Sequence, residues 1–268
     1  GNRIVSQAGG GMNQIFIENC ASLVSAPTTI YNNFIVSDGS FLNAGVAVDK
    51  STYVNIYHNS VNVNSTYADA ACFRNEGSGS SNVEVLNNIF TNNGAGHAFL
   101  ISPTPVGSVS AFDYNNLYTV NGATIGIYDG DTIVDVLDLQ TNHSVGLNSV
   151  SSDPQYISST DLHAGSAGVN DLGIPLASVT TDIDGESRSG TSPDLGADEF
   201  TPLSDNVSIL DLISPSGGCG DSATVIGIVI KNLGLNSQAP FDIVADVVFP
   251  GGNQMITETT DRKSTRLN

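Results

Sequence analysis

The sequence contains no tryptophan and only three cysteines among its 268 residues. Cys20, Cys72 and Cys219 are odd in number and widely separated, so the sequence predicts neither a disulfide framework nor a zinc site with paired cysteines. No apolar stretch approaches the roughly 18 residues of a membrane-spanning helix. We therefore expect neither a disulfide-stabilised scaffold nor a membrane span.

Basic residues are also scarce, with 8 against 27 acidic residues and a net charge of −19. Proteins that bind nucleic acids through phosphate contacts need basic surfaces, so no nucleic-acid partner is expected. A strongly anionic partner would be repelled unless cations bridged the two molecules. The 28 glycines and the 40% hydrophobic content fit thin β-coils with many tight turns.

What the sequence does contain is a repeated pair of short alternating strands joined at a polar corner. In residues 54–63, valine and isoleucine alternate with polar residues on both sides of the corner, which is typical of half-buried strands. Similar pairs occupy 30–36, 83–90 and 112–118. The corner asparagines are Asn33, Asn59, Asn88 and Asn116, separated by 26, 29 and 28 residues. This period indicates a repeat architecture.

A second repeated segment, rich in small and aliphatic residues, keeps step with the first at 45–48, 70–73, 97–101 and 124–128. One period thus holds about three short strands and no helix. Such a unit buries its apolar face only by stacking on the next unit, which predicts a parallel β-solenoid over residues 1–150. The corner asparagines would then form a hydrogen-bonded ladder. An open β-sandwich is the alternative fold.

Residues 151–205 differ in kind, because they are rich in proline, glycine and aspartate and lack the repeat. Between 123 and 205 there are 14 acidic residues and one basic residue, Arg188. The exposed last coil of a solenoid needs a cover, so we expect this segment to be an irregular C-terminal cap.

Motifs in this segment resemble a known family, at residues 152–157, 161–163, 181–188 and 193–200. They are similar to the closing motifs of right-handed parallel β-helix proteins of the choice-of-anchor type, in the pectin-lyase-like superfamily. The family usually has a Ser-Pro pair where this chain has residues 165–168. The resemblance implies an all-β, right-handed parallel β-helix from an exported bacterial protein, frequent in Bacteroidetes, at the cell surface or outside the cell.

Residues 206–260 form a second module that resembles the opening of CARDB-like immunoglobulin-type domains, mainly at 214–220 and 229–234. A complete β-sandwich of that kind needs about 100 residues, so we expect a partial module. Residues 261–268 resemble a non-native tail. The chain also starts within the repeat pattern, and we expect a longer protein whose signal peptide lies outside this sequence.

The pectin-lyase-like resemblance suggests polysaccharide chemistry, for which Asp49, Lys50, Arg74 and Glu76 are the candidate catalytic residues. Lys50 and Arg74 are 24 residues apart, about one period, which predicts neighbouring coils. Hydrolysis would need two carboxylates about 5 to 9.5 Å apart, and elimination would need a base. The alternative interpretation is a group of surface ion pairs on loops.

The acidic motifs around Arg188 allow two interpretations. One is a clasp in which carboxylates hold Arg188 and seal the C-terminal end of the solenoid. The other is a calcium site at Asp182 and Asp184, although the chain lacks the bidentate glutamate of an EF-hand loop. The candidate partners of Arg188 are Asp182, Asp184, Asp198 and Glu199.

Three histidines complete the candidate residues. His58 replaces the first asparagine of a corner pair, so its role is either that of a corner residue or a catalytic one. His143 and His163 show no metal-ligand spacing to each other.

These observations favour a structural, adhesive or glycan-binding segment of an exported surface protein, without a required cofactor. The alternative is a polysaccharide lyase or glycoside hydrolase that acts on an acidic polysaccharide.

Overall fold

The computed structural model describes residues 1–6, 13–39, 44–76, 79–101, 108–120, 124–214, 227–232, 234, 236–237, 239–249 and 252–259. The chain forms two compact units, Gly1–Thr201 and Pro202–Asn268. The predicted all-β class is confirmed, with one short helix among the described residues.

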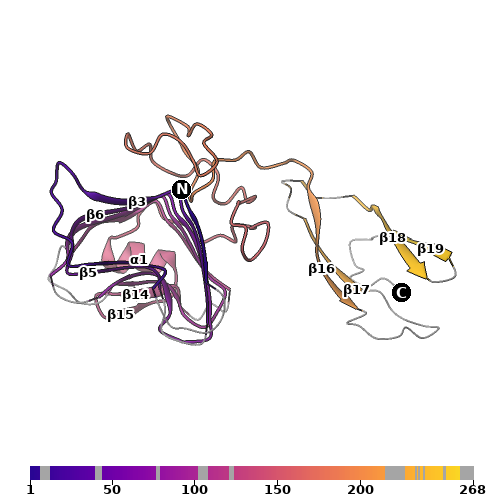
Figure 1. Cartoon of the computed structure of the whole chain (residues 1–268), viewed down its shortest axis with the longest axis horizontal. Coiled ribbons are helices and arrows are strands. Elements are labelled where there is room, and N and C mark those ends of the chain that lie inside the picture. The colour runs from indigo at the N-terminus through magenta and orange to yellow at the C-terminus, as the bar shows by residue number, and fades with distance from the viewer. Residues whose placement is uncertain are drawn as a thin grey trace. The chain divides into compact units, whose positions relative to one another are not determined.

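The first unit is a parallel β-solenoid of about four turns, in which each turn contributes one strand to each of three sheets (Figure 1). Sheet A contains β1 (Arg3–Ser6), β4 (Phe34–Gly39), β7 (Ser60–Ser65), β10 (Ile89–Asn92) and β13 (Asn116–Thr119). Sheet B contains β2 (Ile15–Glu18), β5 (Ala44–Asp49), β8 (Ala71–Asn75), β11 (His97–Ile101), β14 (Gly126–Tyr128) and the antiparallel β15 (Asp131–Ile133). Sheet C contains β3 (Thr28–Tyr31), β6 (Thr52–Tyr57), β9 (Ser81–Leu86) and β12 (Val109–Asp113).

The alternating pattern produces these strands because every second side chain points into the coil. Val54 and Ile56 of β6 are fully buried and pair in register with Val83 and Val85 of β9. Aromatic rings fill the centre of the coils. The ring centroids of Phe99 and Phe112 lie 5.0 Å apart, and those of Phe73 and Phe90 lie 6.0 Å apart. Stacked turns thereby share one continuous apolar core.

The corner between sheets C and A depends on a residue with a left-handed backbone, followed by an inward asparagine. The left-handed residues, with φ between 49° and 60°, are Asn32, His58, Asn87 and Tyr114. Asparagine tolerates this conformation better than most residues.

The asparagine after each left-handed residue joins an amide ladder made of Asn33, Asn59, Asn88 and Asn115. Each side-chain amide donates to the amide oxygen of the next rung, at 2.8, 3.0 and 3.0 Å. The fourth rung is Asn115 and not the expected Asn116, which starts β13 and pairs with Ile89. This turn contains two adjacent asparagines, and its left-handed residue is Tyr114. The pattern therefore did not show that the first asparagine, and not the second, follows the left-handed residue.

A helix that we did not expect covers the last turn of the solenoid. α1 (Val136–His143) starts at Asp135, whose carboxylate accepts a hydrogen bond of 2.8 Å from the backbone of Asp138. Its Leu139 is fully buried in the solenoid core, as is Ile133 of β15. In Figure 1 the helix lies within the outline of the coils.

Residues 151–200, here called the covering segment, pack along the outer face of sheet A. Leu162 and Ala197 pack on Phe34 of β4, and Leu195 packs on Ile89 of β10. The segment lies outside the coil outline in Figure 1. The expectation that this segment seals the C-terminal end is therefore corrected. Sheet A presents apolar side chains outward as well as inward, so its outer face needs a cover.

The second unit contains two antiparallel pairs of strands, β16 (Val207–Ser214) with β17 (Gly227–Asn232) and β18 (Asp242–Phe249) with β19 (Gly252–Thr259). Residues 215–220, part of the CARDB-like motif, and the tail 261–268 lie outside the described residues. No helix in the described part of the chain has the length and apolar character needed to cross a membrane.

Candidate functional site

The four candidate catalytic residues form two local ion pairs. Lys50 Nζ lies 2.9 Å from Asp49 Oδ2, and Arg74 Nη1 lies 2.7 Å from Glu76 Oε2. The register of sheet B pairs Arg74 with Ala47, so Lys50 lies three residues beyond the position next to Arg74. Lys50 and Arg74 thus belong to neighbouring coils, as expected, but they do not lie at paired positions. The paired positions here are 27 residues apart.

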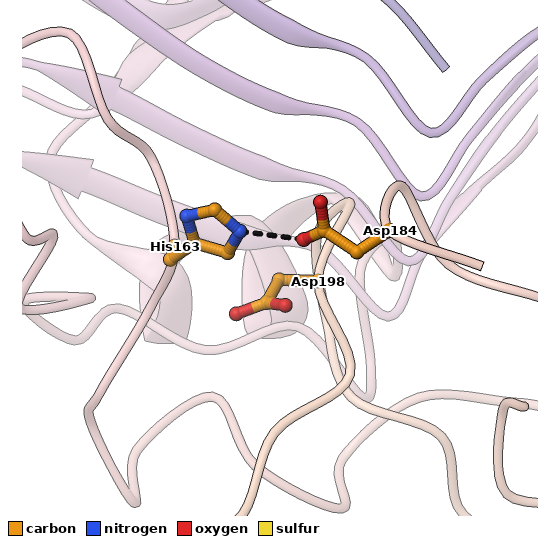
Figure 2. Close-up of side chains that lie close together, drawn as sticks. All are labelled: His163, Asp184 and Asp198. Atoms are coloured by element: carbon orange, nitrogen blue, oxygen red, sulfur yellow. Dashed lines mark hydrogen bonds and ion pairs between the residues drawn. The ribbon is translucent and has the colours of Figure 1, made fainter. Parts of the chain in front are cut away.

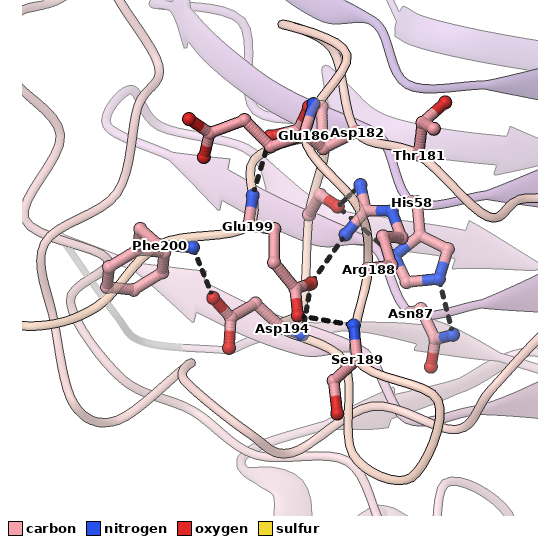
Figure 3. Close-up of polar contacts among 12 residues, drawn as sticks. His58, Asn87, Thr181, Asp182, Glu186, Arg188, Ser189, Asp194, Glu199 and Phe200 are labelled. Atoms are coloured by element: carbon pink, nitrogen blue, oxygen red, sulfur yellow. Dashed lines mark hydrogen bonds and ion pairs between the residues drawn. The ribbon is translucent and has the colours of Figure 1, made fainter.

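Arg188 lies at the centre of a buried polar network between the covering segment and sheet A (Figure 3). Its side chain is 2% exposed and its Nη1 lies 3.2 Å from Glu199 Oε2. Its Nη2 donates to the Asn32 amide oxygen and to the Gly196 carbonyl, both at 3.0 Å. Of the four expected carboxylate partners, Glu199 is the one that forms an ion pair with Arg188.

Asp182 stabilises a turn with both of its carboxylate oxygens. Oδ1 accepts from the backbone N–H groups of Asp184 and Glu186 at 3.0 and 2.8 Å, and Oδ2 accepts from that of Glu199 at 3.1 Å. Asp182 thus links two turns of the covering segment through backbone contacts. The side chains of the expected calcium pair have different partners, because Asp184 contacts His163 whereas Asp182 accepts backbone hydrogen bonds.

Asp194 is a second buried carboxylate beside this network. It is 1% exposed and accepts backbone hydrogen bonds from Asp171 at 2.6 Å and Phe200 at 2.7 Å. Burial raises the pKa of Asp194 to about 7. Through its two hydrogen bonds, the side chain of Asp194 holds the loop backbone at Asp171 and Phe200.

His58 is fully buried between the solenoid and the covering segment. Its Nδ1 lies 3.2 Å from the Gly196 carbonyl and its Nε2 lies 2.9 Å from Asn87 Nδ2. These contacts suit a neutral ring that donates from Nδ1 and accepts at Nε2. Burial, with a further contribution from the charge of Arg188, lowers the pKa of His58 well below its ordinary value. The geometry assigns His58 a structural role.

A cluster of His163, Asp184 and Asp198 lies at the surface edge of the covering segment (Figure 2). His163 Nε2 is 2.6 Å from Asp184 Oδ2, and His163 Nδ1 contacts Asp161. One potential ligand atom from each cluster residue lies within 4.8 Å of the others. The imidazole also packs edge-on against Phe34, with ring centroids 4.9 Å apart.

The cluster holds titratable groups whose ionisation the surroundings change. Burial, together with the charges of Asp182 and Asp184, raises the pKa of Asp198 to about 6, although the charge of His163 lowers it. Burial alone would lower the pKa of His163, but hydrogen bonds to Asp184 and Asp161 raise it.

The cluster was not predicted as a unit from the sequence. One local signal was present, because Asp161 and His163 are two residues apart in an extended segment, where alternate side chains point the same way. Nothing in the local pattern joins them to Asp184 or Asp198, which come from separate turns.

The outer face of sheet C presents aromatic and polar side chains in rows. Tyr31, Tyr57 and Leu86 pair in register in one row. Thr29, Asn55 and Glu84 pair in register in the next row. Tyr31 is 44% exposed, and the Tyr57 hydroxyl contacts Glu84.

Comparison of the chain with protein families, curated proteins and solved structures found no match. The observed geometry therefore identifies the chain at the level of its fold, a parallel β-solenoid of about four turns.

Proposed function

We propose that the chain is a non-catalytic segment of an exported bacterial surface protein, in which the solenoid is a rigid scaffold that binds glycan. The motifs of residues 151–200 support this proposal through their resemblance to choice-of-anchor proteins, which are exported. The resemblance of the second unit to CARDB-like modules favours the same extracellular placement.

The observation that carries the proposal is the local pairing of the candidate catalytic residues. Lys50 and Arg74 each engage a neighbouring carboxylate, Asp49 and Glu76, instead of facing each other across coils. A lyase needs a base and a group that neutralises the uronate in one place. The buried ionisable groups of the covering segment serve its own backbone, as Asp182 and Asp194 do.

Sheet C supplies the glycan-binding surface of this proposal. The ring of Tyr31, which is exposed whereas that of Tyr57 is buried, suits contact with the apolar face of a sugar ring, and Asn55 and Glu84 in the next row offer hydrogen-bonding groups. Glu84 and the net charge of −19 disfavour acidic polymers, so the ligand of this face is a neutral glycan.

This surface is tested by measuring the affinity of the full chain for neutral polysaccharides, with affinity electrophoresis or calorimetry. We expect Tyr31→Ala to weaken binding at least about tenfold, which is 1.4 kcal/mol. Tyr67→Ala is the matched control, because Tyr67 is 41% exposed but lies outside sheet C. Equal binding by both variants and the unchanged protein would contradict the proposed surface.

A polysaccharide lyase or hydrolase remains the alternative, and a direct assay separates the lyase from the scaffold. The chain is incubated with uronate polymers and unsaturated products are followed by ultraviolet absorption. We expect no product. Product formation that is lost on Lys50→Ala or Arg74→Ala would establish the enzyme instead.

A further inference from the structure

The cluster of His163, Asp184 and Asp198 combines an imidazole with two carboxylates from three separate turns. These residue types are ligands for zinc and similar divalent metals. The hydrogen bond between His163 Nε2 and Asp184 Oδ2 already brings two of the ligand atoms to 2.6 Å.

The orientation of His163 is fixed in the way that metal-binding histidines require. Asp161 contacts Nδ1, and Phe34 supports the ring from sheet A with an interplanar angle of 87°. A histidine whose Nδ1 hydrogen is held by a carboxylate presents the lone pair of Nε2 to a metal. Nε2 is the atom that faces the cluster.

Asp198 is the most buried of the three cluster residues. Its residue is only 7% exposed, and among the described residues no arginine or lysine forms an ion pair with it. The charge of His163 and a backbone hydrogen bond from Ala164 favour its ionised form, whereas the charges of Asp182 and Asp184 oppose it. A buried carboxylate beside other carboxylates is unfavourable unless positive charge compensates it.

We propose that His163 Nε2 and the carboxylates of Asp184 and Asp198 bind one divalent transition-metal ion, with zinc as the reference ion. Metal–ligand distances of about 2.0–2.2 Å place tetrahedral ligand atoms roughly 3.3–3.6 Å apart. The three atoms, which lie within 4.8 Å of one another, reach this spacing by small side-chain movements. Asp161 is the positioning residue, and water completes the coordination.

Calcium fits this site less well than zinc does. Calcium takes six to eight oxygen ligands, whereas this site offers one nitrogen and two carboxylates. Asp182 is no further ligand, because both of its oxygens accept backbone hydrogen bonds.

Arg3 is the positive group that competes with a metal at the cluster. It lies 3.8 Å from Asp161 and 4.0 Å from Asp184, and its side chain is 48% exposed. An exposed ion pair at this distance is weak. Arg3 does not reach Asp198 within ion-pair distance, so the buried carboxylate is left for the metal.

A bound metal would join three turns of the covering segment to one another above Phe34. A ligand that binds the folded state alone stabilises it by RT ln(1 + [L]/Kd), and so raises the melting temperature. At a hundredfold excess over the dissociation constant, we expect the first unit to melt about 5–10 °C higher.

Thermal melts and calorimetry of the chelator-treated full chain with zinc chloride test the proposal. We expect one zinc ion per chain, a higher melting temperature with zinc and a smaller or no increase with calcium chloride. His163→Ala and Asp184→Asn should each abolish the increase. Asp184 has a 48% exposed side chain, so Asp184→Asn keeps the variant folded even if His163→Ala does not fold.

His143→Ala is the matched control for adventitious zinc binding by histidine. His143 lies on α1, 3.9 Å from Asp131, outside the cluster, and the variant should retain the zinc effect. The proposal is overturned if zinc leaves the unchanged protein unaffected, or if its effect persists in Asp184→Asn.

Discussion

Arg188 Nη2 donates a hydrogen bond of 3.0 Å to the amide oxygen of Asn32, which lies 156 residues earlier in the chain. Asn32 is the left-handed corner residue of its turn, and its amide nitrogen donates to the Thr181 carbonyl at 2.5 Å. Asn87, an equivalent corner residue, exchanges hydrogen bonds of 2.7 and 3.0 Å with the backbone of Ile174. Corner amides thus attach the covering segment to the solenoid.

Removal of Arg188 should destabilise the first unit strongly. Arg188→Ala leaves Glu199, 15% exposed, without its buried partner, at a cost of about 3–5 kcal/mol in the free energy of unfolding. Arg3→Ala is the control, because the Arg3 side chain is 48% exposed and should contribute under about 1 kcal/mol. Denaturant melts measure the free energy of unfolding of both variants. Equal losses would show that the contacts of Arg188 stabilise the fold no more than an exposed ion pair does.

The amide ladder should be sensitive at its interior rungs. The Asn88 side chain accepts from Asn59 and donates to Asn115 and to the carbonyl groups of Ile56 and Leu86. Asn88→Ala leaves several of these buried groups without partners, so we expect a loss of at least about 3 kcal/mol.

Asn142→Ala is the control for that variant, since the contact of Asn142 with Asp138 is on the exposed face of α1. Its unfolding free energy should change by less than about 0.5 kcal/mol. Similar denaturation midpoints for the two variants would mean that the ladder adds no stability of its own.

Gly196 should not tolerate a side chain. Its φ is +87°, and an added Cβ would lie 2.7 Å from both Ile89 Cδ1 and Ser60 Oγ. We expect Gly196→Ala to lower the melting temperature through a loss of about 2–4 kcal/mol. Gly190→Ala, where nothing lies within 4 Å, should leave it within about 0.5 kcal/mol.

His58 should make the solenoid sensitive to acid. Because its folded-state pKa lies well below the ordinary 6.5, the unfolded chain binds the proton more readily. The contribution of neutral His58 to the free energy of unfolding is therefore fully present above pH 6.5. It is lost as the pH falls below 6.5, by up to about 1.4 kcal/mol per pH unit.

His58→Asn is the informative variant, because asparagine occupies the same corner at Asn32 and Asn87. From pH 6.5 to pH 5, the free energy of unfolding of the unchanged protein should fall more than that of His58→Asn. A difference that does not vary with pH would show that His58 is not held neutral. His143→Asn provides the comparison for a histidine outside the corner, on α1.

The sequence by itself determined the solenoid. Alternation of apolar and polar residues is a local property of strands, and a period of 26 to 29 residues that holds three strands leaves stacking as the way to bury them. Val54 and Ile56 were identified as core residues for this reason. The sequence also placed Arg188 among acidic motifs, which include its partner Glu199.

The exact register depended on strand pairing, which spacing along the chain did not define. In sheet B, Arg74 pairs with Ala47, 27 residues earlier, so a separation of 24 residues does not place Lys50 beside it. Likewise, the fourth rung of the ladder is Asn115 and not Asn116, because Asn115 follows the left-handed residue Tyr114.

The tertiary structure alone decided where the covering segment packs and which polar groups meet there. Residues 151–200 have no repeat, and their contacts with Phe34 and Ile89 join positions more than 70 residues apart. His163, Asp184 and Asp198 likewise come together because three turns pack on one sheet. This proximity results from the burial of apolar surface between segments that are far apart in the sequence, which a local sequence pattern does not predict.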